Sequence, residues 1–123
     1  MKTNESQENY LETILVLSKK LPVVRSVDIA EDLGFKKSSI SIAMKNLREK
    51  GLISVSNAGF ITLTEEGSKI ATMIFERHTI ISECLIQLGV PKEIALEDAC
   101  RIEHDLNPIS FEAIKAYVIS NRK

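Results

Sequence analysis

The spacing of apolar residues between positions 26 and 64 constrains the fold most strongly. Segments 26–34 and 37–50 have apolar residues at helical spacing, and glycines at 34 and 51 mark their ends. In runs 52–56 and 60–64, apolar residues alternate with serine and threonine across a short Asn57-Ala58-Gly59 connection, which predicts a β-hairpin. Two helices joined by a tight turn and followed directly by a hairpin predict a winged helix-turn-helix.

The rest of the chain is expected to be helical, so the fold class is mainly α with one small β-hairpin. We expect Ser26 and Ser38 to cap the second and third helices and Thr64 to start a long helix. Only five glycines and three prolines interrupt the sequence, which disfavours a sandwich or barrel. The predicted helices cover residues 5–19, 27–33, 38–50, 64–88, 92–106 and 110–120.

No apolar run approaches the roughly 20 residues that a membrane span requires. The first ten residues, MKTNESQENY, contain no apolar segment typical of a secretion signal. We therefore expect a cytoplasmic protein with no membrane partner. Cys84 and Cys100 both lie in helical sequence, and in a reducing compartment we expect no disulfide between them.

Charge is distributed unevenly although the net charge is only −1. Residues 19–50 contain eight basic and four acidic side chains, whereas residues 64–123 contain seven basic and ten acidic ones. A nucleic-acid-binding half joined to an acidic, cation-binding half would give this asymmetry. A solvated basic face without a partner would give it too.

The winged helix and its positive charge predict binding to double-stranded DNA, with the second helix of the motif in the major groove. Lysines and serines near the start of that helix suit phosphates, whereas the outward Ile42 suits a thymine methyl group, unless it packs on a neighbouring loop. The expected DNA-binding residues are Arg25, Lys36, Lys37, Ser38, Ser39, Ser41, Ile42 and Lys45.

Cys100, Glu103 and His104 are spaced i, i+3 and i+4 in the predicted fifth helix, so they share one face. Thiolate, carboxylate and imidazole are good metal ligands, but one helix cannot complete a coordination sphere. The other histidine, His78, lies in the apolar stripe of the long helix, where a chargeable ring needs a partner. Singly, each residue has a structural explanation, such as a hydrogen-bonded core histidine or a small buried cysteine. Together they predict a metal site.

Four segments, 8–12 (ENYLE), 28–31 (DIAE), 77–78 (RH) and 97–104 (EDACRIEH), resemble the metal-dependent repressors typified by the diphtheria toxin repressor and the manganese transport regulator. The resemblance implies metal ligands at Glu12, His78, Cys100, Glu103 and His104. Cys100 follows the iron-type members and Glu12 the manganese type. A thiolate prefers softer ions such as Fe(II), whereas two carboxylates suit Mn(II), so Fe(II) is slightly favoured over Mn(II).

The resemblance also implies a DNA-binding domain over residues 1–70 and a helical metal-binding and dimerisation domain over residues 71–123. It implies a homodimer that binds a palindromic operator when metal fixes the spacing of the DNA-reading units. The printed sequence ends at Lys123, before any third, SH3-like domain of the kind that many iron-type members carry.

Three alternatives stay open on the sequence. The first is a winged-helix regulator that ignores metal, and the second is a protein interaction module. The third is an enzyme with Cys100 as nucleophile and a nearby histidine as base, which is disfavoured because the sequence has no glycine-rich loop and no evident small-molecule site.

Overall fold

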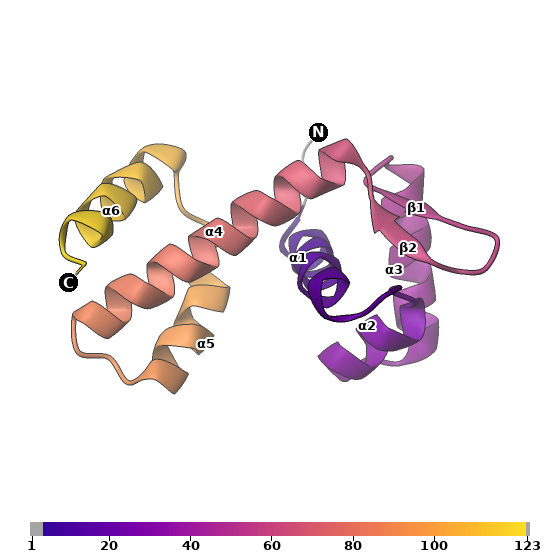
Figure 1. Ribbon diagram of the computed structural model, residues 1–123, viewed down its shortest axis with the longest axis horizontal. Helices are drawn as coiled ribbons and strands as arrows, with labels where there is room; N and C mark the ends of the chain where they lie inside the picture. Colours follow the sequence, from indigo (N-terminus) through magenta and orange to yellow (C-terminus); the bar gives the residue numbers. More distant parts are fainter. Residues whose placement is uncertain (1–3, 123) are drawn as a thin grey trace. The chain divides into compact units, whose positions relative to one another are not determined.

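The computed structural model describes residues 4–122 and is mainly helical with one two-stranded hairpin in that range, which confirms the predicted fold class (Figure 1). The chain divides into two compact units, residues 1–72 and 73–123, and the long helix α4 runs from the first into the second. None of the described helices is long and apolar enough to cross a membrane. The elements are α1 (Glu5–Lys20), α2 (Ser26–Leu33), α3 (Lys37–Glu49), β1 (Ile53–Val55), β2 (Ile61–Leu63), α4 (Glu65–Gln87), α5 (Lys92–Ile102) and α6 (Pro108–Ser120).

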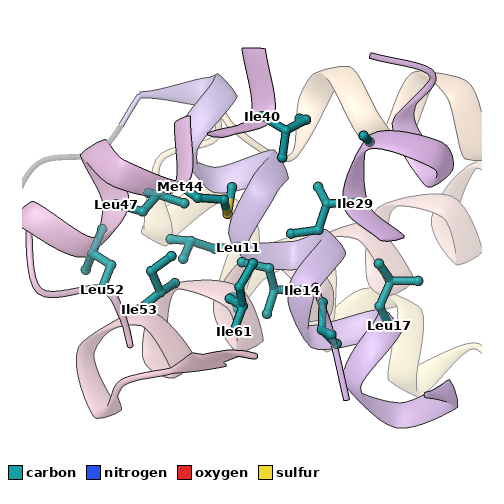
Figure 2. Packing of buried hydrophobic residues seen from close by; sticks show 13 residues of the cluster. Leu11, Ile14, Leu17, Ile29, Ile40, Met44, Leu47, Leu52, Ile53 and Ile61 are labelled. Atoms are coloured by element: carbon teal, nitrogen blue, oxygen red, sulfur yellow. The ribbon is translucent and has the colours of Figure 1, made fainter. Parts of the chain in front are cut away.

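The core of the first unit is built from the apolar stripes of α1, α2 and α3 and from the hairpin (Figure 2). Leu11 and Ile14 on α1 meet Ile29 on α2 and Ile40 on α3, and all four are at most 1% exposed. These are the positions that helical spacing predicts to face inward. The opposite face of α3 is left in solvent, so the motif presents its polar side chains outward.

The hairpin pairs β1 with β2 in antiparallel register, with Ile53 opposite Leu63 and Val55 opposite Ile61. Its turn closes through the backbone N–H of Gly59, which donates to the carbonyl of Ser56 at 2.9 Å. The N–H of Ile61 donates to the carbonyl of Val24 at 2.7 Å, which ties the wing to the segment that enters α2. The wing is therefore a fixed part of the DNA-binding motif.

Helix α4 begins against the end of α3. The hydroxyl of Thr64 donates to the carbonyl of Gly51 at 2.7 Å and accepts from the N–H of Gly67 at 3.2 Å, which confirms Thr64 as the start of the long helix. Gly67 is required by close approach, because a Cβ built there would lie 1.9 Å from the carbonyl oxygen of Leu52.

Two predicted helix caps are wrong. Ser26 is the first residue of α2 and Arg25 is its N-cap, where the Asp28 carboxylate accepts from the Arg25 N–H at 2.9 Å. Ser38 lies inside α3, whose N-cap Lys36 makes no side-chain capping hydrogen bond. The carboxylate of Asp28, at the third position of the helix, satisfies the backbone N–H of the N-cap residue Arg25. Helix α2 therefore starts at Ser26, one residue earlier than predicted.

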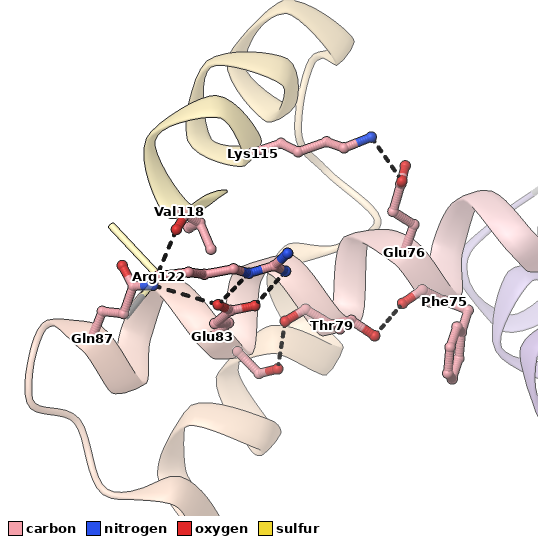
Figure 3. A network of polar contacts seen from close by, with 9 residues as sticks. Phe75, Glu76, Thr79, Glu83, Gln87, Lys115, Val118 and Arg122 are labelled. Carbon is pink, nitrogen blue, oxygen red and sulfur yellow. Dashed lines mark hydrogen bonds and ion pairs between the residues drawn. The ribbon is translucent and has the colours of Figure 1, made fainter. Parts of the chain in front are cut away.

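In the second unit, α6 is fastened to α4 by an apolar cluster and by polar contacts. Ile80 on α4 packs with Phe111 and Val118 on α6. Lys115 pairs with Glu76 at 2.8 Å, and Arg122 grips both carboxylate oxygens of Glu83 at 2.8 Å each (Figure 3). Residue 122 thus holds the end of the described chain against α4.

The boundary between α5 and α6 differs from the prediction. Helix α5 ends at Ile102 rather than at residue 106, and α6 starts at Pro108 rather than at residue 110. Pro108 disfavours helical geometry in the residue before it, and Asn107 caps α6 by accepting from the N–H of Ile109 at 2.8 Å. The chain must therefore leave α5 before Asn107, which puts Glu103 and His104 in a turn.

Candidate metal centre

Three of the side chains predicted to bind metal converge in the second unit. His78 comes from α4, Cys100 from α5, and Glu103 from the C-cap of α5. Their potential ligand atoms all lie within 4.8 Å of one another. The Nδ1 atom of His78 lies 3.0 Å from Oε2 of Glu103 and 3.7 Å from Sγ of Cys100. Residues far apart in sequence are thus placed around one point.

The Glu103 carboxylate lies at the closed end of this group. Its side chain is 0% exposed, and Nε2 of His104, itself 2% exposed, lies 3.4 Å from Oε1 of Glu103. That distance suits an ion pair, but Oε1 has no hydrogen-bond partner. A buried carboxylate oxygen without a donor is costly, and a cation at this point would remove that cost.

The other side of the group is open. Cys100 is exposed and the His78 side chain is 21% exposed, so an ion has access from the thiol side. Imidazole, thiolate and carboxylate together suit a divalent transition metal. The residues present therefore fit a metal ion on both geometry and chemistry. Cys84, half-buried on α4, is a free thiol outside this group.

The fifth predicted ligand, Glu12, belongs to the first unit. It lies half-buried on α1 and is not among the three residues of the group. Its assignment as a ligand rests on the family resemblance.

Sequence reasoning missed Arg77 as part of this centre. Arg77 precedes His78 on α4, is 6% exposed, and donates to the carbonyls of Glu103 and Leu106. The signal was present in the sequence, because position 77 lies three residues after Ile74 and four before Ile81, within the apolar stripe of α4. A charged residue in such a stripe requires specific partners.

The candidate DNA-binding surface lies in the first unit. All eight residues predicted for it are exposed: Arg25, Lys36, Lys37, Ser38, Ser39, Ser41, Ile42 and Lys45. The Ile42 side chain is 64% exposed on the outer face of α3. The guanidinium of Arg25 lies over the ring of Phe60, 4.9 Å from its centroid, so a residue of the hairpin orients Arg25.

A hollow of about 190 Å³ adjoins this surface between α3 and the hairpin. Ser41, Lys45 and Arg48 of α3 line it together with Ser26. Arg48 was not predicted as a site residue, although its spacing of three from Lys45 puts both on one face of the helix. Two cationic side chains and two hydroxyls around one hollow are suited to a phosphate group.

A winged helix-turn-helix followed by a helical unit with imidazole, thiolate and carboxylate groups at one point defines a metal-responsive DNA-binding protein. Residues 2–59 match the family described as iron dependent repressor, N-terminal DNA binding domain, and residues 64–121 match its metal binding and dimerisation domain. The chain therefore belongs to the iron-dependent repressor family, and it is a metal-dependent transcriptional regulator rather than an enzyme.

Relatives in sequence agree. The chain is 34% identical over 110 residues to the transcriptional regulator MntR of Escherichia coli O6:H1, covering 89% of this chain and 71% of MntR. It is 31% identical over 117 residues to an uncharacterised HTH-type transcriptional regulator of Methanocaldococcus jannaschii, covering 94% of both chains.

Solved structures share the fold. The manganese regulator SloR matches with a TM-score of 0.82 and 23% identity over 97% of this chain. A manganese-dependent transcriptional repressor in complex with manganese matches with a TM-score of 0.83 and 25% identity over 91% of this chain. IdeR of T. acidophilum matches with a TM-score of 0.78 and 25% identity over 99% of this chain. The chain spans 55%, 52% and 57% of the lengths of these three chains, respectively.

Proposed function

We propose that this protein represses transcription in the cytosol by binding double-stranded DNA as a homodimer when it holds Fe(II) or Mn(II). The observation that carries the proposal is the convergence of the potential ligand atoms of His78, Cys100 and Glu103 within 4.8 Å, in a chain whose first unit has an exposed winged-helix surface. A regulator that ignored metal would gain nothing from a buried carboxylate oxygen with no hydrogen bond.

The proposed ligands are His78, Cys100 and Glu103, with His104 beside Glu103 and with Glu12 added on the family resemblance. A bound divalent ion would add positive charge beside the buried Glu103 carboxylate, whose Oε1 has no hydrogen-bond partner. The chain's own part is to hold an imidazole, a thiolate and a carboxylate at one point and to exclude water from the Glu103 end.

The identity of the metal follows from ligand type. The thiolate of Cys100 favours Fe(II), whereas carboxylates suit Mn(II). The relative in E. coli is named MntR, and one matching structure is titled as a manganese-dependent repressor with manganese, so both ions are kept in the proposal, with Fe(II) slightly favoured.

The proposed DNA contacts come from the outer face of α3 and from the adjoining hollow. Phosphate contacts are proposed for Lys37, Lys45 and Arg48 and a base-edge contact for Ile42, and the exposure of all four side chains supports this. The proposed partner for dimerisation is a second copy, because α6 leaves Ile109, Tyr117 and Ile119 exposed while it buries Phe111 and Val118 against the same unit.

The experiment is anaerobic fluorescence anisotropy with a pool of palindromic duplexes, with and without Fe(II) and Mn(II). We expect metal to tighten DNA binding at least tenfold, equivalent to about 1.4 kcal/mol of coupling. The double variant Glu103→Ala, His104→Ala is expected to abolish that tightening and to keep the weak metal-free binding. Equal binding with and without either metal would overturn the proposal and leave a metal-independent winged-helix regulator.

A further inference from the structure

The side chain of Arg77 on α4 donates hydrogen bonds to the backbone of the turn that follows α5. Its Nη1 atom donates to the carbonyl of Glu103 at 3.1 Å and to the carbonyl of Leu106 at 2.7 Å. Its guanidinium lies 5.4 Å from the centroid of the Phe111 ring on α6. One buried side chain of α4 therefore grips both ends of the turn that joins α5 to α6.

This turn carries two of the proposed ligands. Helix α5 ends at Ile102, so the carbonyls of residues 103–106 have lost the helical partners they would have in a longer helix. A hydrogen bond from a charged donor is about twice as strong as one from a neutral donor. Arg77 therefore fixes the backbone on which the Glu103 carboxylate and the His104 imidazole are mounted.

The arrangement also links the ligands across elements. His78 follows Arg77 on α4, so the residue beside one proposed ligand holds the main chain of another, 26 residues later. Rotation of Glu103 about its backbone would open the 3.0 Å contact between its Oε2 and Nδ1 of His78. The Arg77 hydrogen bonds oppose that rotation.

Packing alone does not account for an arginine here. Arg77 is 6% exposed, and its Nε is buried without a hydrogen-bond partner. An apolar side chain of similar length would fill the same space against Phe111 without burying a charge or leaving a donor unsatisfied. The cost is explained if the two carbonyl contacts serve the neighbouring site.

We propose that Arg77 is a positioning residue of the metal centre, which holds Glu103 and His104 in ligating geometry before the ion arrives. The inference rests on the proposed metal site and adds to it a residue that touches no metal. Groups that orient metal ligands typically contribute 10- to 100-fold to metal affinity.

The test compares Arg77→Met with Arg122→Met, using Co(II) as the probe under anaerobic conditions. Arg77→Met keeps the apolar stem and removes the donors. Arg122→Met is the matched control, because Arg122 also fastens α6 to α4, through Glu83, but contacts neither Glu103 nor Leu106. The readouts are the Co(II) dissociation constant, the visible spectrum at saturating Co(II), and urea unfolding in EDTA.

We expect Arg77→Met to weaken Co(II) binding by about 10- to 100-fold and to change the ligand-field bands of the saturated protein. Arg122→Met is expected to lower metal-free stability and to leave the Co(II) affinity and spectrum unchanged. Arg77→Lys, which keeps a charged donor at the end of a shorter side chain, is expected to restore part of the affinity, and it is the variant to measure if Arg77→Met does not fold.

Two other results would overturn the inference, and they have different meanings. If the wild type shows no thiolate-to-Co(II) charge-transfer band that Cys100→Ala removes, the proposed metal site fails and the role of Arg77 fails with it. If the wild type shows that band and the folded Arg77 variant binds Co(II) with the same affinity and spectrum, only the positioning role is wrong.

Discussion

His78 and Glu103 are 25 residues apart in sequence, yet Nδ1 of one lies 3.0 Å from Oε2 of the other. At that distance the imidazole and the carboxylate share either a proton or a metal ion. A metal ligand must be deprotonated, so protons and metal compete for the same atoms. Metal binding at this pair should therefore release protons and weaken as the solution is acidified.

Glu103→Gln removes the charge from the closed end of the centre and keeps the size of the side chain. A ligand that binds the folded protein alone stabilises it, so in the wild type we expect Mn(II) at 100 times its dissociation constant to add about 2.7 kcal/mol to the free energy of unfolding. The variant should lose most of this gain, because an amide is a far weaker ligand than a carboxylate. Urea unfolding in Mn(II) and in EDTA measures the gain in the free energy of unfolding for each protein.

The matched control is Glu97→Gln, which removes a carboxylate from the exposed face of α5, outside the cluster. This variant should keep the full stabilisation by Mn(II). If Glu103→Gln is stabilised by Mn(II) as much as Glu97→Gln, the carboxylate of Glu103 is not a ligand.

The winged helix could be predicted from the sequence because local signals carry it. Apolar spacing gave the inward positions of α1 and α3, and Gly34, in left-handed geometry with φ of 71°, ends α2 as predicted. The N-cap of α2 was harder to predict from the sequence. Asp28 accepts from the N–H of Arg25, and a serine one residue later offered an equally plausible start.

The cluster that is proposed to bind metal could be predicted only in part. Cys100 and Glu103 lie one helical turn apart, so their proximity is local. His78 was expected to have a partner because a chargeable ring in an apolar stripe needs one. The end of α5 at Ile102 was missed, because it depends on Pro108 and on the contacts from Arg77 to the turn carbonyls. Contacts from a side chain to the backbone of a distant turn leave no periodic signal in the sequence.

Ile42 is proposed to contact a thymine methyl group. Replacing the contacted thymine of the best-binding duplex by uracil removes that methyl group, and we expect a loss of about 1 kcal/mol of binding free energy in the wild type. Ile42→Ala should bind both duplexes equally. Anisotropy titrations of the two proteins with the two duplexes give the coupling free energy between Ile42 and the methyl group. If uracil substitution weakens binding equally in both proteins, Ile42 does not contact the methyl group.

Lys45 is proposed to contact phosphate, so Lys45→Ala should weaken binding to every duplex by a similar factor. The slope of log affinity against log salt concentration should fall by about 1 in the variant. Lys92→Ala, on the exposed start of α5, is the charge-matched control and should leave the slope unchanged. A changed sequence preference in Lys45→Ala, at unchanged slope, would assign Lys45 to a base instead.

Gly67→Ala tests the contact between the start of α4 and Leu52. At an ordinary position inside a helix, alanine is up to about 1 kcal/mol more favourable than glycine. Here the added Cβ would lie 1.9 Å from the Leu52 carbonyl oxygen, so we expect a loss of about 1 to 3 kcal/mol in the free energy of unfolding. Ser68→Ala, one residue further along the helix, controls for propensity, and a Gly67→Ala protein as stable as wild type in urea would refute the close approach.

Tyr117→Asp tests α6 as the dimer surface. Tyr117 is 59% exposed beside the exposed Ile86 and Leu88, with which it lines one hollow, so a charge there should cost little in the monomer and much in a buried interface. Sedimentation velocity should show dimer dissociation at concentrations at least tenfold higher than in the wild type. Ile42→Asp, at a similarly exposed position on α3, should sediment as the wild type does. A dimer unaffected by Tyr117→Asp would place the interface elsewhere.

The ion pair between Glu83 and Arg122 should make stability depend on pH in the acid range. The hydrogen bonds from Arg122 are the main cause that lowers the pKa of Glu83 below its ordinary value of 4.5. A carboxyl whose pKa is lower in the folded state stabilises the fold above the unfolded-state pKa, and this contribution is lost as the pH falls through the folded-state pKa. Arg122→Met should therefore be less stable than the wild type at pH 7, and the difference should shrink below about pH 4.5 and vanish once Glu83 is protonated.

Urea unfolding of the metal-free proteins between pH 3 and 7 measures this difference in the free energy of unfolding, with Lys92→Met as the control for loss of a cation. A difference that stays constant over this range would mean that the guanidinium of Arg122 stabilises α6 through contacts other than its ion pair with Glu83.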